Sequence, residues 1–160
     1  MAGSVALAGG RAYLGHYGGE VICAGLARTN IVWRYKGGDA FFSSPAVTEK
    51  FVLIGGRDKR LHCVDRDTGK LLWAFETRDE VDCSPVAAGD KVLFGSGDGR
   101  FYMCSVTDGK LLWSYDVGKP ISSSPAVVGT VVVVGAEDGV VYAFGDKAPG
   151  AKSKIRNRSR

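Results

Sequence analysis

The chain is organised around a repeat of forty residues. The segment at residues 67–73 (DTGKLLW) returns at residues 107–113 (TDGKLLW), and a more divergent copy (ARTNIVW) stands at residues 27–33. The three tryptophans of the chain are therefore spaced forty residues apart. Self-similarity at a period of this length is the signature of repeat architectures, in which each unit buries its apolar surface against its neighbours. The chain is thus expected to be an array of similar units.

Residues typical of turns and strand ends follow the same period. Recurring features are a glycine at 15, 55, 95 and 135, a Ser-Pro pair at 44–45, 84–85 and 124–125, and a two-residue turn at 18–19, 58–59, 98–99 and 138–139. Asp-Gly and Gly-Gly pairs between apolar runs are strong signals for β-hairpins. Each unit is therefore predicted to be four antiparallel strands, the last of which carries the tryptophan.

The predicted strands are apolar on consecutive residues, as in residues 51–54 (FVLI) and 131–134 (VVVV). A sheet with one face in water would instead alternate apolar and polar residues. A four-stranded sheet of about forty residues that is covered on both faces by copies of itself is a propeller blade. No segment keeps a helical apolar period for three turns without a glycine or proline. We therefore predict an all-β propeller chain of about four blades.

The units differ in completeness. Residues 4–36, 43–76 and 83–116 each supply four strands, whereas the last unit, 122–145, ends before any tryptophan segment, so the last blade is expected to be incomplete. Residues 147–160 carry six basic groups and no acid, so residues 1–146, with 15 basic and 17 acidic groups, have a net charge of −2. The stretch 146–160 is predicted to be an unpacked basic tail, and the folded part lacks the charge expected of a nucleic-acid binder.

Targeting and cysteine patterns add little. The first eight residues lack the features of a signal peptide, and the longest apolar run is far shorter than the ~20 residues that a spanning helix needs. The four cysteines, at 23, 63, 83 and 104, form no Cys-x-x-Cys pair and show no metal spacing. Because Cys23 and Cys63 share one repeat position, they are predicted to be small buried residues rather than disulfide partners.

With these residues the sequence resembles the pyrroloquinoline-quinone-type (PQQ-like) β-propeller repeat family, over positions 1–145. The family pattern is a small residue, Asp two positions later, then Thr-Gly, and Trp ten positions after the small residue. The second unit holds these places with Cys63, Asp65, Thr68, Gly69 and Trp73. The third unit holds them with Met103, Ser105, Asp108, Gly109 and Trp113. The first unit has Cys23, Gly25, Arg28 and Thr29 before Trp33, and the fourth keeps only Ala143.

The resemblance implies a tryptophan-docking role for part of this pattern. In the family the tryptophan lies between adjacent blades, which makes Trp33, Trp73 and Trp113 expected interblade residues, together with Gly69 and Gly109. A large ring set over a glycine backbone fills space and covers peptide groups. Family rings have seven or eight blades, so this chain is expected to form about half of one.

Function is less constrained by the resemblance. Quinone-dependent dehydrogenases of the family hold their cofactor with calcium, acidic residues and, in many members, two adjacent cysteines, and no such cysteine pair occurs here. Most members bind no quinone and use the ring as a scaffold, and the family leans to the periplasm or cell envelope. We therefore expect a non-catalytic scaffold without a cofactor. The alternatives are a fragment of a PQQ- and calcium-dependent dehydrogenase, or a ligand-sensing module of a larger chain.

A candidate interaction rim follows from the meander. Turns between the second and third strands lie at the same edge as the connections between units, which gathers His16, Arg57, Asp58, Asp98, Glu137 and Asp138. Rigid blades present such loops side by side, so this surface could bind a protein partner or an ion. The alternative is that the three aspartates simply occupy positions where hairpin turns need Asp. His62 aligns with Ile22, Tyr102 and Tyr142, which favours a packing role, and no catalytic motif or metal spacing is present.

An open arc of blades would leave its two end sheets uncovered, and apolar patches of that size are rarely left in water. We therefore expect the chain to self-associate, as a homodimer or similar assembly, into a ring of about eight blades. A stable monomer of 17.0 kDa would contradict this expectation.

Overall fold

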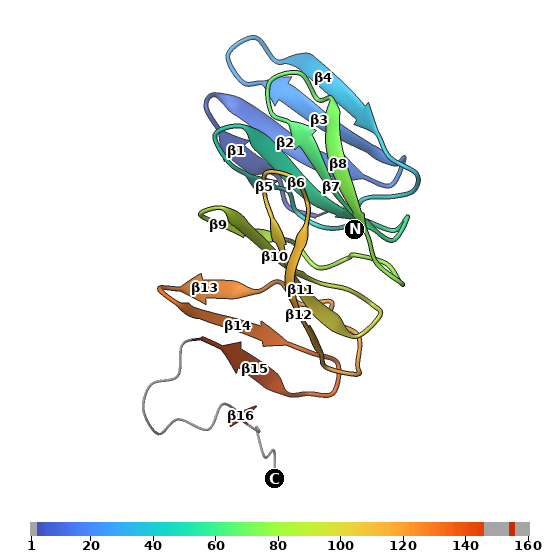
Figure 1. The fold of residues 1–160 in the computed structure, drawn as a ribbon. Coiled ribbons are helices and arrows are strands. Elements are labelled where there is room, and N and C mark those ends of the chain that lie inside the picture. The colour runs from blue at the N-terminus through green and yellow to red at the C-terminus, as the bar shows by residue number, and fades with distance from the viewer. Residues whose placement is uncertain (1–2, 146–153, 156–160) are drawn as a thin grey trace.

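The computed structural model describes residues 3–145 and the backbone of residues 154–155. These residues form sixteen strands in four antiparallel sheets of four strands each, and no helix occurs among them. The sheets follow one another along the chain and stack face to face (Figure 1). The predicted all-β architecture of stacked four-stranded units is confirmed.

The strands fall where the period places them. The first sheet holds β1 (Ala6–Ala8), β2 (Arg11–His16), β3 (Glu20–Gly25) and β4 (Asn30–Lys36). The second holds β5 (Ala46–Val47), β6 (Phe51–Gly56), β7 (Arg60–Asp65) and β8 (Leu71–Glu76). The third holds β9 (Val86–Ala88), β10 (Lys91–Gly95), β11 (Arg100–Ser105) and β12 (Leu111–Asp116). The fourth holds β13 (Ala126–Val128), β14 (Val131–Gly135), β15 (Val141–Phe144) and β16 (Lys154–Ile155).

The hairpins between the second and third strands need a left-handed residue at one fixed position. Gly19, Gly99 and Gly139 occupy it with φ of 72°, 81° and 75°, and Lys59 occupies it in the second sheet with φ of 66°. Glycine adopts this conformation without steric cost, whereas a residue with a side chain does so rarely. The Asp-Gly signal therefore reports backbone geometry, and the second sheet keeps that geometry even without the glycine.

The first strands of successive sheets contact one another, β1 with β5, β5 with β9 and β9 with β13. They form the inner edge of the stack. Hydrogen bonds between residues forty positions apart tie this edge together. The Ser4 amide donates to Ser44 Oγ at 2.7 Å, and the Ser44 amide donates to Ser84 Oγ at 2.8 Å.

Burial on both faces explains the consecutive apolar residues in the strands. In β6, Leu53 packs in a cluster with Val92 and Phe94 of the third sheet, whereas its neighbour Ile54 packs in a cluster with Tyr13 of the first sheet. Both side chains are fully buried. Successive side chains of a strand point to opposite faces, so a sheet between two others has no polar face.

The fourth sheet is the shortest, and its last strand comes from the basic segment. β16 pairs with β15 so that Ile155 lies opposite Val141, forty residues on from the Tyr115–Phe101 pair of the third sheet. The sequence predicted no fourth strand for the unit 122–145 and an unpacked tail at 146–160. Two backbone residues of that tail therefore continue the register of the repeat, and the tail's other residues lie outside the described part.

Candidate functional site

The tryptophans of the first two sheets lie against the next sheet. Trp33 Nε1 donates to the Arg66 carbonyl at 2.9 Å, and a Cβ on Gly69 would stand 2.6 Å from the Trp33 ring. Trp73 repeats this arrangement with the Val106 carbonyl, at 2.9 Å, and with Gly109, at 2.6 Å. Both glycines have φ of 70°. A ring that touches the peptide backbone leaves no room for a side chain.

Trp113 has different surroundings. It is 37% exposed and contacts Phe101 of its own sheet and Phe144 of the fourth sheet, with ring centroids 6.5 and 5.1 Å away. The residues forty positions after Gly109 lie outside the described part of the chain. The structure thus brings two of the three predicted tryptophans onto predicted glycines.

The Asp-x-x-Thr-Gly segment before Trp73 is a hydrogen-bonded turn. Asp65 Oδ1 accepts hydrogen bonds from the Thr68 amide at 2.8 Å and from Thr68 Oγ1 at 2.7 Å. Its third donor is the Asp67 amide, at 3.1 Å. The Thr68 hydroxyl, followed by these amides, lowers the pKa of the Asp65 carboxyl. The carboxylate of the motif therefore stabilises the turn that positions Gly69.

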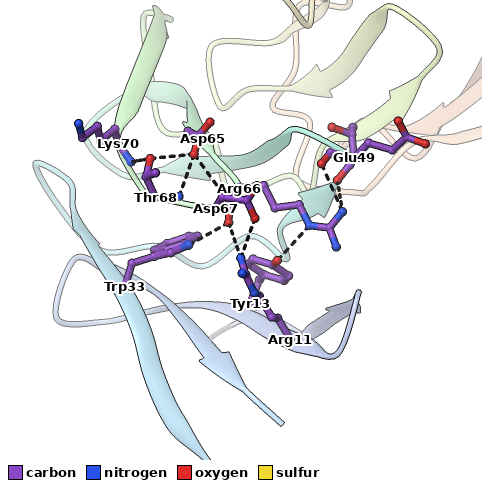
Figure 2. A network of polar contacts seen from close by, with 10 residues as sticks. Arg11, Tyr13, Trp33, Glu49, Asp65, Arg66, Asp67, Thr68 and Lys70 are labelled. Carbon is purple, nitrogen blue, oxygen red and sulfur yellow. Dashed lines mark hydrogen bonds and ion pairs between the residues drawn. The ribbon is translucent and has the colours of Figure 1, made fainter. Parts of the chain in front are cut away.

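Arg66 bridges the first two sheets beside this turn (Figure 2). Its Nε donates to Tyr13 Oη at 3.1 Å, and its Nη1 donates to the carbonyls of Thr48 and Glu49 at 3.1 and 3.4 Å. Sequence reasoning did not single out Arg66. The usable signal was a break in the period, because the residues forty positions to either side, Leu26 and Val106, are aliphatic.

Each rim aspartate binds the residue four positions later. Asp58 Oδ1 lies 2.9 Å from His62 Nε2, whereas Asp98 and Asp138 accept the hydroxyls of Tyr102 and Tyr142 at 2.6 and 2.7 Å. These acids join the turn to the third strand of the same sheet.

His62 is buried and contacts two sheets. Its Nδ1 lies 2.9 Å from Tyr35 Oη of the first sheet, and its Nε2 binds Asp58 of its own sheet. Burial raises the pKa of the Asp58 carboxyl, but the hydrogen bonds from His62 and the Gly38 amide outweigh it and lower the pKa. Both ring nitrogens of His62 are thus engaged in structural contacts.

The other rim residues bind their neighbours. His16 Nδ1 accepts the Gly18 amide at 2.9 Å, and Glu137 Oε1 accepts the Ser122 hydroxyl at 3.2 Å. The Arg57 guanidinium binds Asp82 through Nε and Nη2 at 3.2 and 2.8 Å. It also stacks 3.9 Å above the Phe42 ring. A hollow of about 220 Å³ lies beside these rim residues. It is lined by Asp79, Glu80, Asp82, Gly97, Pro120, Ile121, Ser122 and Glu137.

No group of three or more His, Cys, Asp or Glu side chains within the described part of the chain is placed to hold a metal ion. Nor does that part contain a helix long and apolar enough to cross a membrane.

Serines near the inner edge are occupied with backbone contacts. Ser43 Oγ donates to the Gly55 carbonyl at 2.9 Å and accepts the Gly55 amide at 2.8 Å, and Ser123 does the same with Gly135 at 2.7 and 3.0 Å. Cys83 takes this position in the third sheet, where its Sγ accepts the Gly95 amide at 3.2 Å. These side chains fix the end of the second strand in the second, third and fourth sheets.

The four cysteines are buried and free, which confirms the prediction made for Cys23 and Cys63 from their shared repeat position. Burial raises the pKa of the Cys63, Cys83 and Cys104 thiols to about 12 and also raises that of Cys23. The thiolate is the reactive form, so at pH 8 a pKa near 12 leaves about one thiol in ten thousand ionised.

We therefore expect the native chain to resist a thiol reagent such as 5,5′-dithiobis-(2-nitrobenzoic acid) at pH 8. Unfolding in guanidinium should expose four rapidly reacting thiols, counted by absorbance at equal protein concentration. A thiol that reacts in native buffer as fast as in the unfolded chain would contradict the burial seen here.

Comparison with protein families gives one match. A family model described as outer membrane protein assembly factor BamB matches residues 1–81 and 57–152. These two overlapping segments cover most of the chain. No curated protein matches the sequence.

Solved structures share the fold at low sequence identity. BamB from Moraxella catarrhalis superimposes with a TM-score of 0.81 and 20% identity, over 89% of this chain and 46% of that one. The computationally designed Ika4 protein gives 0.82 and 16%, over 91% of both chains. The computationally designed Ika8 protein gives 0.80 and 17%, over 90% of this chain and 45% of that one. The chain thus spans about half the length of BamB and Ika8 and nearly the whole of Ika4.

Proposed function

Because the chain belongs to the family described as outer membrane protein assembly factor BamB, we propose that it is a non-catalytic β-propeller scaffold for protein–protein contacts. One observation carries the proposal: each end sheet has one face that no other described sheet covers, and on the fourth sheet this face is apolar. We propose that a second copy covers these faces and closes the ring. The family description also supports a place in the cell envelope.

The exposed valines of the fourth sheet show which of its faces is uncovered. Val141 is 37% exposed, whereas Phe101, at the same repeat position in the third sheet, is fully buried by the sheet that follows. Val131 on the same face is 41% exposed. The exposure therefore results from position at the end of the stack.

The contact between two copies would differ from the contacts between neighbouring sheets within one chain. Thr29 stands where Gly69 and Gly109 receive a tryptophan, and it keeps the left-handed backbone with φ of 48°. Ser153 stands forty residues after Trp113. The tryptophan and the glycine that would meet in this junction are therefore both replaced. This agrees with a contact between copies that does not use the tryptophan–glycine packing.

Light scattering on a size-exclusion column tests self-association. We expect a dimer, with twice the mass of the 17.0 kDa chain. Val141→Lys should shift the equilibrium towards monomer by about tenfold or more in Kd, because a charge would be buried in an apolar contact.

Leu72→Lys is the matched control, since Leu72 is 47% exposed on β8 of an internal sheet. It should leave the mass unchanged. A well-folded wild-type monomer of 17.0 kDa would overturn the closure, and equal effects of both variants would place the contact elsewhere.

The absence of catalysis and of a cofactor is part of the same proposal. The rival is a fragment of a quinoprotein dehydrogenase, which predicts binding of PQQ with Ca²⁺ once the ring is complete. Titration of the assembled protein with both, followed by the quinone absorbance, separates the two. A saturable spectral shift that requires Ca²⁺ would favour the rival.

A further inference from the structure

An arginine fills the space between two hairpins where the first and second sheets meet. We call this contact the first junction, and the contact between the second and third sheets the second junction. Arg66 lies between the β1–β2 hairpin of the first sheet and the β5–β6 hairpin of its own sheet, where a Cβ on Gly9 would overlap its Nη2. Its guanidinium binds one hydroxyl, on Tyr13, and two backbone carbonyls, of Thr48 and Glu49. The acceptors that bind the Arg66 guanidinium here are therefore all uncharged.

The corresponding place in the second junction is empty. Val106 stands forty residues after Arg66, and its carbonyl accepts Trp73 Nε1 as the Arg66 carbonyl accepts Trp33 Nε1. The backbones therefore match, and the side chain is four atoms shorter. A hollow of about 290 Å³ remains, lined by Thr48, Glu49, Lys50, Phe51, Gly89, Asp90, Val106 and Thr107. Two residues that contact Arg66, Gly9 and Glu49, correspond at forty positions to Glu49 and Gly89 of this lining, whereas Tyr13 and Thr48 correspond to Leu53 and Ala88 outside it.

The lining of this hollow is rich in hydrogen-bond acceptors. Glu49 replaces Gly9, so a carboxylate is added at a position where the first junction has no side chain. Thr48 and Thr107 add hydroxyls, and Asp90 adds a second carboxylate, one oxygen of which binds Lys91 Nζ at 2.7 Å. Lys50 is the one cation of the lining.

A planar guanidinium suits such a site better than a compact ammonium does. Its five donors lie in a fixed fork and can bind carbonyls, hydroxyls and a carboxylate together, as Arg66 does with three acceptors. The aliphatic part of an arginine side chain would pack on Phe51 and Val106.

We propose that this hollow between the second and third sheets receives an arginine side chain of a protein partner, in the place that Arg66 fills one junction earlier. The proposal rests on the scaffold function above and names a residue type that the scaffold recognises. The repeat makes one copy of the site self-occupied and leaves the next copy open to a partner.

The test uses N-acetyl-arginine amide, titrated into the ¹⁵N-labelled chain and followed by amide shifts. We expect saturable shifts centred on Gly89, Val106 and Thr107, and at least about tenfold weaker binding of the citrulline analogue, which has the same shape without the charge. Equal binding of the two analogues, or shifts centred elsewhere, would overturn the proposal.

Two variants test the site itself. Val106→Arg should fill the hollow with an internal guanidinium and abolish the shifts, and Glu49→Gln should raise Kd about tenfold. Glu76→Gln, at an exposed carboxylate of β8, should leave Kd unchanged. If Val106→Arg fails to fold, the Glu49→Gln and Glu76→Gln pair decides: equal Kd values would overturn the proposal. Because these measurements do not depend on ring closure, a monomeric chain that binds arginine would separate this site from self-association.

Discussion

Gly55→Ala is expected to lower the free energy of unfolding by about 3 kcal/mol, although it adds a single methyl group. The new Cβ would overlap the Val81 carbonyl oxygen and stand 2.6 Å from Val81 Cγ1. Val81 belongs to the connection between the second and third sheets and is fully buried. Because a backbone atom cannot rotate away, the strand itself would have to move, and the Ser43 contacts with the Gly55 amide and carbonyl would be lost with it.

Gly135→Ala provides the matched control for this prediction. Gly135 holds the same repeat position in the fourth sheet and binds Ser123 as Gly55 binds Ser43. The nearest atom to its added Cβ is Ser123 Oγ at 3.4 Å, an ordinary contact. We expect a loss below about 1 kcal/mol in urea denaturation monitored by tryptophan fluorescence. Equal losses at both positions would show that the backbone contact is not the cause.

Trp33→Ala is expected to cost about 4 kcal/mol, the usual range for a large aromatic residue removed from a core. Trp33 is 7% exposed and packs 6.0 Å from the Tyr13 ring. The substitution also leaves the Arg66 carbonyl without the Nε1 donor at 2.9 Å. Because the ring covers Gly69 of the second sheet, its loss opens the junction between two sheets.

Two comparisons separate these contributions. Trp33→Phe keeps an aromatic ring but removes the donor, so about half of the loss should remain. Trp113→Ala removes the same side chain where it is 37% exposed, and should cost about 2 kcal/mol. Urea denaturation ranks the three variants. A loss at Trp113 that equals the loss at Trp33 would contradict the unequal burial of the two rings.

Much of the fold was predictable because each unit repeats the same local instructions. The Ser-Pro pairs, the strand-ending glycines and the hairpin turns recur at forty residues, and sixteen strands fall into four sheets in that register. The consecutive apolar residues Leu53 and Ile54 predicted burial on both faces, and they pack in different junctions. The departure at the end, β16, could not be foreseen because its two residues carry no strand signal of their own.

The candidate site was less accessible to sequence reasoning. The rim aspartates were predicted as partner-binding or turn-forming residues, and Asp58, Asp98 and Asp138 each bind the residue four positions later. That pairing depends on which side chain the third strand presents. Arg66 and the hollow beside Val106 were not predicted, since both arise from two hairpins of different sheets.

The sequence by itself determined the unit, the period and the positions where glycine recurs, because turns and strand faces depend on residues close together in the chain. Only the tertiary structure decided what each junction contains. The first junction is filled by Arg66, the second leaves a hollow at Val106, and Trp113 has a partly open setting. The physical reason is that each junction is formed by side chains of two different sheets. Whether a gap or a contact results depends on how their sizes fit together in space.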